Sequence, residues 1–222
     1  MLEDLLREFL SNENSLRIEA EREFTKRKET TPRDVIMGLA EITSNPHADI
    51  RCLSIVLLRG ITVRDQQMWA QVPESEIKQI RDFFLQRLQH EPLQYVRRKL
   101  IDCIAAIARL GDWPDLFSLI VQLIDGAAEH ILTSLELVEK LGEYVGENLV
   151  AHTEGLLSII RPCLLSENIN VRIHAARALM SLAFDLKEVL ADQPPPESAF
   201  YHPSNPTQLP LFLCSDGRNC AS

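Results

Sequence analysis

A short motif, in which a hydrophobic residue is followed directly by arginine, returns four times along the chain near the start of an expected helix. Its arginines are Arg17, Arg51, Arg97 and Arg172, separated by 34, 46 and 75 residues. The last separation corresponds to about two units of 37, because an apolar helical stretch that begins at Ile131 takes the place of the missing motif. The chain is therefore expected to consist of repeats of about 40 residues, each with two helices.

This period strongly limits the fold. Units of about 40 residues with two helices each are typical of an α-solenoid of the HEAT or armadillo type. Each unit of a solenoid buries its apolar face only against its neighbours, and the stack presents a long curved surface rather than a pocket. We expect an all-α superhelix of about five helix pairs without a β-sheet. The function is then expected to concern partner proteins rather than chemistry.

Turn signals and a period of 3.6 residues place the helices. Prolines at positions 32, 73 and 114 suit helix starts, where the fixed φ fits and no hydrogen bond is lost. Trp69 and Trp113 are expected in loops between repeats, as anchors that pack between units. The expected pairs are 2–10 with 15–28, 31–43 with 46–63, 73–89 with 92–110, 114–124 with 127–145, and 149–165 with 169–190. An interruption of the last helix near Asp185 stays open.

The last part of the chain differs in composition. We expect the solenoid to cover residues 1–190, because residues 191–222 hold six of the twelve prolines and have almost no helical periodicity. Such a Pro-rich tail is expected to be disordered. Its segment 209–214 is apolar but too short and too proline-rich for a helix. A solenoid normally ends in a repeat with a polar outer face, and we expect this one to lack such a cap.

Composition argues against several classes of protein. The net charge of −9, from 32 acidic and 23 basic residues, disfavours a nucleic-acid partner, which would need clustered positive charge. Five widely spaced cysteines without a CxxC pair indicate a reducing compartment, the cytosol or nucleus. Residues 1–8 are acidic where a signal peptide needs positive charge. No apolar run approaches 18 residues, so no membrane span is expected.

The residues that carry chemistry do not form a catalytic or metal-binding pattern. The pairs His47 with Cys52 and His174 with Cys163 lack a nearby group that would orient the imidazole. No Cys/His spacing fits a zinc site, and no glycine-rich phosphate loop is present. The charged run 19–28 is interpreted as a solvated helix face with i,i+4 pairs. We expect neither an enzyme nor a cofactor.

The recurring arginine is expected to be structural. It lies in the first turn of each second helix, where the helix dipole disfavours a cation. A partner is therefore expected, such as an acidic side chain or a turn carbonyl of the same or the adjacent repeat. We predict that Arg97 and Arg172 in particular lie within hydrogen-bonding reach of such an acceptor.

With the repeats laid out, the chain resembles a known family. The segment 49–61, DIRCLSIVLLRGI, resembles the IR-x-x-A-x-V-L-L-R-R helix of importin-β family nuclear transport receptors. Trp69, the stretch Glu91-x-x-x-x-Val96-Arg97-Arg98, and Trp113-Pro114 follow in the family's order. The opening segment 16–21 resembles the x-R-x-x-A-E pattern of the family's first repeat.

The resemblance is strong over residues 1–125 and that of a general HEAT repeat over 126–190. One departure concerns Gly60, which stands where the family often has a second arginine. The tail from residue 191 has no counterpart in the family pattern. Family members are also several times longer, so the chain resembles their amino-terminal part.

The resemblance implies a nuclear import receptor, or its amino-terminal part, without catalytic activity. It implies binding of the GTP form of the small GTPase Ran through second helices that line the concave face, with nucleoporins and basic cargo proteins as further partners. The location would be cytoplasm, nucleus and nuclear pore. Arg59, Arg98 and Asp102 are the polar residues on these helices that we expect to contact a protein partner. The alternative is a HEAT scaffold or adaptor for other proteins.

Overall fold

The computed structural model describes residues 1–145 and 152–191, with side chains placed for residues 1–142 and 152–183. The described residues form an all-α solenoid without strands, so the expected fold class is confirmed. The helices are α1 (Leu2–Phe9), α2 (Asn14–Thr30), α3 (Pro32–Ile42), α4 (Ala48–Arg64), α5 (Gln66–Trp69), α6 (Glu74–His90), α7 (Gln94–Ala108), α8 (Pro114–Ile124), α9 (Ala128–Val145), α11 (Thr153–Leu164) and α12 (Ile169–Ala191).

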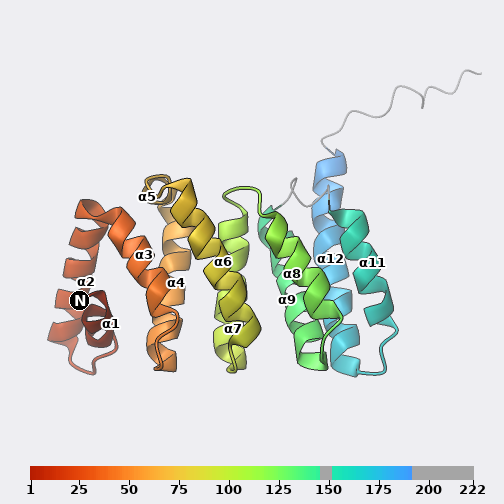
Figure 1. Ribbon diagram of the computed structural model, residues 1–222, viewed down its shortest axis with the longest axis horizontal. Helices are drawn as coiled ribbons and strands as arrows, with labels where there is room; N and C mark the ends of the chain where they lie inside the picture. Colours follow the sequence, from red (N-terminus) through yellow and green to blue (C-terminus); the bar gives the residue numbers. More distant parts are fainter. Residues whose placement is uncertain (146–151, 192–222) are drawn as a thin grey trace, which may run out of the picture.

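The helices pair into five antiparallel units arranged in two layers (Figure 1). In that view α3, α6, α8 and α11, the first helices of their units, lie in front of the second helices α4, α7, α9 and α12. Contacts between neighbouring units run mainly through α4, α7, α9 and α12, whereas the first helices are spread further apart. The stack therefore curves toward the second helices, which form its inner face.

Helix boundaries follow the local sequence signals closely. Pro32 and Pro114 occupy the first position of α3 and α8, where the missing N–H costs nothing. The loop expected around Trp69 is wrong, because this residue ends the short helix α5 and is buried. A single helical turn is too short to produce a periodic signal in the sequence. The backbone of α12 continues through Asp185, so the alternative with an interruption there is excluded.

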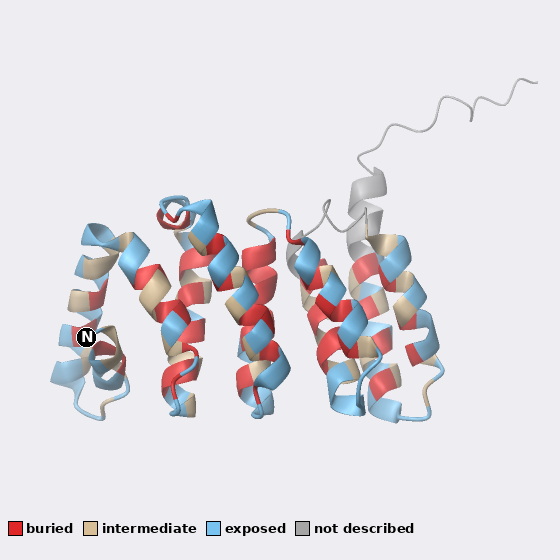
Figure 2. Ribbon diagram, viewed as in Figure 1, coloured by how far each residue is buried: buried red, intermediate tan, exposed pale blue. Residues whose placement is uncertain are grey.

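One apolar core runs through the units (Figure 2). It is densest at α7, which has a second helix on each side, α4 and α9. Residues 103–108 of α7 are buried without exception. Burial also raises the pKa of the Cys103 thiol, which is therefore a core side chain rather than a reactive group.

The recurring arginine closes the turn inside each unit. In all four units that carry it, a guanidinium Nη donates to the backbone carbonyl six residues earlier. The bonds are Arg17 to Ser11 (2.8 Å), Arg51 to Asn45 (2.8 Å), Arg97 to Glu91 (3.3 Å) and Arg172 to Ser166 (2.7 Å). This arrangement satisfies carbonyls near the end of the first helix. It also offsets the unfavourable interaction between the arginine charge and the dipole of the second helix. The predicted acceptors for Arg97 and Arg172 are confirmed.

Two of these arginines also reach the following unit. Arg51 Nη2 donates to Glu91 Oε1 at 2.9 Å, and both side chains are buried. The same carboxylate accepts Arg87 Nη2 at 2.9 Å and the backbone N–H of Leu93 at 3.2 Å. Arg97 lies 3.6 Å from Glu129 of the next unit, which is an exposed and looser pair. Of these two contacts with the following unit, the one at Glu91 is the shorter and the more buried.

We predict that Gly60→Ala raises the free energy of unfolding by about 0.5–1 kcal/mol. Gly60 lies inside α4, and a Cβ built there meets nothing within 4 Å. Urea unfolding would measure the gain. Gly38→Ala is the matched control, because its Cβ would lie 2.9 Å from Leu2 Cδ2 and the gain there should be smaller. An unchanged or lower stability of the Gly60 variant would contradict the prediction.

The expected domain division stays a prediction. The last described residue, Ala191, lies at the expected boundary, and the tail lies outside the described residues. Among the helices that are described, none combines the length and the apolar character needed to cross a membrane.

Candidate functional site

The inner face carries all three residues expected to contact a partner. Arg98 and Asp102 lie one turn apart on α7, and Arg59 lies on α4. Arg98 is exposed, with 58% of its side-chain surface accessible, whereas Arg59 and Asp102 are half-buried. Burial is the main cause of the raised pKa of Cys103, on which the charges of Arg59 and Asp102 also act in opposite directions. Both charges therefore lie within electrostatic range of this buried thiol.

Arg98 and Asp102 line a hollow formed by three successive second helices, which we call the inner-face hollow. It lies between α7, α9 and α12, so no single unit could form it. Its lining residues are Arg98, Lys99, Ile101, Asp102, Glu136, Glu139, Lys140, His174 and Arg177. Arg59 lines a different hollow, between α2 and α4. The structure therefore brings together two of the three expected residues.

Charge pairing in the inner-face hollow is loose. Arg98 Nη2 lies 3.5 Å from Glu136 Oε1, and the same carboxylate oxygen lies 3.8 Å from His174 Nε2. His174 Nδ1 lies 3.9 Å from Glu139 Oε2 and has no hydrogen-bond partner. Such long pairs contribute little to stability. They leave charged groups of both signs available to a protein partner, whose side chains can replace these contacts.

The residues missed on α9 and α12 have a recognisable spacing. Glu136 and Lys140 are four residues apart on α9, and His174 and Arg177 are three apart on α12. Residues at these distances lie on one face of a helix. Aligning the second helices by their arginine motif and marking charged pairs one turn apart would have found them. What the sequence does not contain is the lateral distance between the helices.

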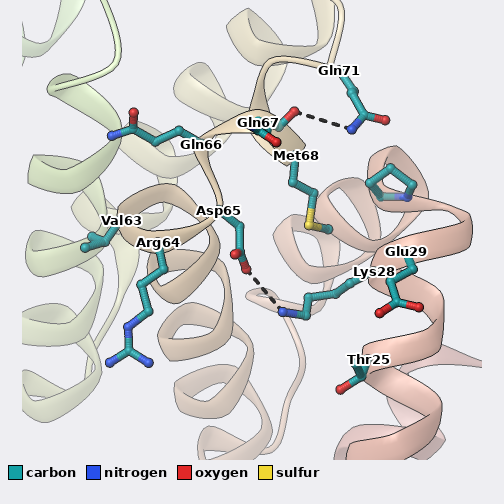
Figure 3. A pocket seen from close by; sticks show the side chains of 11 residues that line it. Thr25, Lys28, Glu29, Val63, Arg64, Asp65, Gln66, Gln67, Met68 and Gln71 are labelled. Carbon is teal, nitrogen blue, oxygen red and sulfur yellow. Dashed lines mark hydrogen bonds and ion pairs between the residues drawn. The ribbon is translucent and has the colours of Figure 1, made fainter.

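A third hollow lies between the first and second units, between α2 and the junction of α4 with α5 (Figure 3). Lys28 Nζ on α2 bridges it by an ion pair of 3.1 Å with Asp65 Oδ2. Its lining is largely polar, with Thr25, Glu29, Arg64 and glutamines of α5. It is open to solvent, which is suited to a protein surface rather than to an enclosed small molecule.

Metal-binding clusters and activated thiols are absent among the described residues. Across the parts of the chain that the structure describes, no three His, Cys, Asp or Glu side chains cluster in a way that would hold a metal ion. Burial raises the pKa of Cys52 and Cys163, which disfavours the reactive thiolate. The arrangement supports binding of charged protein side chains.

Stacked helix pairs with a tight inner layer and a polar inner face define a HEAT-repeat solenoid. Residues 92–193 match a family model described as "IPO5-like, TPR repeats". A comparison of the sequence with curated proteins gives no match.

Three solved structures share the fold. Yeast importin-β (Kap95p) matches with a TM-score of 0.73 at 21% identity, covering 86% of this chain and 25% of that one. The Kap95:Nup1 complex gives the same TM-score, identity and coverage. Kap121p bound to RanGTP matches with a TM-score of 0.65 at 21% identity, covering 86% of this chain and 20% of that one.

The family-model match and the shared fold agree with the resemblance to the importin-β family that the sequence indicated. The family model supports this over residues 92–193, and the solved structures establish the fold over most of the chain. The chain spans only a fifth to a quarter of the length of the solved proteins that it matches.

Proposed function

We propose that this chain acts in protein import into the nucleus by binding the GTP form of the small GTPase Ran through its inner face. The observation that carries the proposal is the fold shared with Kap121p, which was solved bound to RanGTP. The match covers most of this chain. The loosely paired charges of the inner face support a protein partner in the same region.

Three residues are proposed to contact the GTPase. Arg98 has the more accessible guanidinium of the two arginines and needs only a loose pair to be broken. Asp102, one turn further along α7, presents the opposite charge into the same hollow. Arg59 on α4 extends the face toward the first unit. Together they offer both signs of charge, which favours a specific orientation of the partner.

Further partners and the cellular location follow from the same proposal. Kap95p was solved with Nup1, which supports nucleoporin binding by this chain as well. The net charge of −9 of this chain favours basic cargo proteins. The location would then be the cytoplasm, the nucleus and the nuclear pore.

We predict that the folded chain retains Ran loaded with a non-hydrolysable GTP analogue and does not retain Ran loaded with GDP. The double substitution Arg98→Glu with Asp102→Lys should weaken binding about tenfold or more, equivalent to about 1.4 kcal/mol. The swapped charges keep the i,i+4 pairing and the net charge of α7. Biolayer interferometry with the immobilised chain would measure both affinities.

The control for this experiment is Lys78→Glu, an exposed charge on α6 in the outer layer, which should leave binding unchanged. Circular dichroism would establish that each variant is folded. A folded wild-type chain without GTP-dependent binding would refute the proposal and favour the HEAT scaffold alternative. Equal weakening by the control variant would refute the assignment to the inner face.

A further inference from the structure

The last described helix has an exposed apolar face. On α12, Val171, Ala175, Ala178 and Leu182 are buried and face the helices that α12 contacts, α9 and α11. The opposite side holds five exposed apolar residues with successive spacings of four and three, which we call the α12 stripe. Its members are Ile169, Ile173, Ala176, Met180 and Ala183. This spacing places them in one row along the helix.

The exposure of this row is unusual within the solenoid. Ile169 is 54% exposed and Met180 71% exposed. On α7, which has a second helix on both sides, residues 103–108 are all buried. α12 contacts α9 and α11, and no further helix is described after it along the chain. The α12 stripe therefore has the composition of a buried interface and points away from the unit before it.

The opposite end of the solenoid does not have this feature. The surface of α2 is rich in charged residues between positions 19 and 28, most of them exposed or half-buried. A polar end of this kind needs no cover, whereas an apolar row of five residues favours a partner. The question is which partner covers the α12 stripe.

The chain itself continues beyond α12 with an apolar segment. Residues 192–222 follow the helix, and within them residues 209–213 read Leu-Pro-Leu-Phe-Leu. α12 has 23 residues and is about 35 Å long at about 1.5 Å per residue. Residues 192–208 can span up to about 55 Å when extended. The segment can therefore reach every point of the α12 stripe.

Charge and a high local concentration favour the apolar segment 209–213 over a second copy of the chain as the partner of the α12 stripe. Residues 192–222 carry Asp192, Glu197 and Asp216 against one arginine, and Arg177 is exposed on α12 beside the stripe. A short covalent connection also gives a local concentration of about millimolar, well above that of a second copy in a dilute solution.

We propose that residues 209–213 pack along the α12 stripe of the same chain and cap the apolar end of the solenoid. The contact shields this end from self-association. It does not use Arg59, Arg98 or Asp102, the residues proposed to contact Ran.

Cys214 directly follows the segment and provides the test. Met180→Cys places a second thiol in the α12 stripe, with Cys52→Ser and Cys220→Ser removing the competing thiols outside the buried core. Mild oxidation of the dilute full-length protein should then give a disulfide within one chain, identified by peptide mass spectrometry. The matched control is Leu16→Cys on α2 at the other end, which is also an exposed apolar position, 42% accessible.

We expect the disulfide between Cys214 and the thiol introduced by Met180→Cys to form in a yield about tenfold above that of the control, in line with the local concentration. Leu211→Asp with Phe212→Asp should abolish the difference without a change in helical content. Equal yields at both positions would overturn the proposal. Disulfides between chains that increase with protein concentration would also overturn it and assign the α12 stripe to a second copy.

Discussion

Replacing Glu91 with alanine is expected to lower the free energy of unfolding by about 3–5 kcal/mol. Its carboxylate is 2% exposed and accepts hydrogen bonds from Arg51, Arg87 and the backbone of Leu93. Removing it leaves the guanidinium of Arg51, which is 7% exposed, without its buried counter-charge. The loss should be large because an unpaired buried charge keeps its full desolvation cost.

Urea unfolding followed by circular dichroism would measure this loss. Glu91→Gln should cost less than the alanine variant, because the amide oxygen can still accept one of the hydrogen bonds. Glu74→Gln serves as the control, since Glu74 is 80% exposed and lies 3.7 Å from Arg81. The control should change stability by less than about 0.5 kcal/mol. A similarly small change for Glu91→Ala would show that the buried cluster does not hold units two and three together.

Replacing Trp113 with alanine is also expected to cost about 3–5 kcal/mol. Its ring is 3% exposed and lies at the N-terminus of α8. The Arg81 guanidinium of the preceding unit lies 5.6 Å from the ring centroid and donates to the Asp112 carbonyl at 3.0 Å. This confirms the predicted position between the third and fourth units. The truncation would leave a cavity at their junction and remove a cation–π contact.

Trp113→Phe tests how the loss of stability depends on the size of the truncation. The buried indole Nε1 has no hydrogen-bond partner, so phenylalanine loses volume but no polar contact and should cost clearly less than alanine. Thermal unfolding of both variants against the wild type would measure the difference. An unchanged melting temperature for Trp113→Ala would mean that the residue is not a packing anchor and would favour a ligand role.

Local chemistry explains why the helices were predictable. Proline at positions 32 and 114 fixes a helix start without help from the rest of the fold. The arginine motif is also local, because its acceptor lies only six residues earlier in each unit. Its need for an acceptor could therefore be inferred from the unfavourable dipole, although the carbonyl six residues earlier could not.

Contacts between distant segments could not be predicted in the same way. Glu91 was noted in the sequence as part of a family pattern, but its pairing joins residues 40 positions apart. The inner-face hollow needs α7, α9 and α12 side by side. Arg98 and Asp102 were anticipated there, whereas Glu136 and His174 were not, and the proposed binding role of Arg59, Arg98 and Asp102 stays a prediction.

The sequence by itself determined the repeat, the helix boundaries, the absence of strands among the described residues and the resemblance to the importin-β family. These depend on short-range periodicity and turn chemistry, which act within a few residues. Only the tertiary structure decided which charges meet on the inner face, that Glu91 is buried between two units, and that the α12 stripe is exposed. The reason is physical: burial and charge pairing depend on the lateral packing of neighbouring units, and a repeat pattern does not contain that distance.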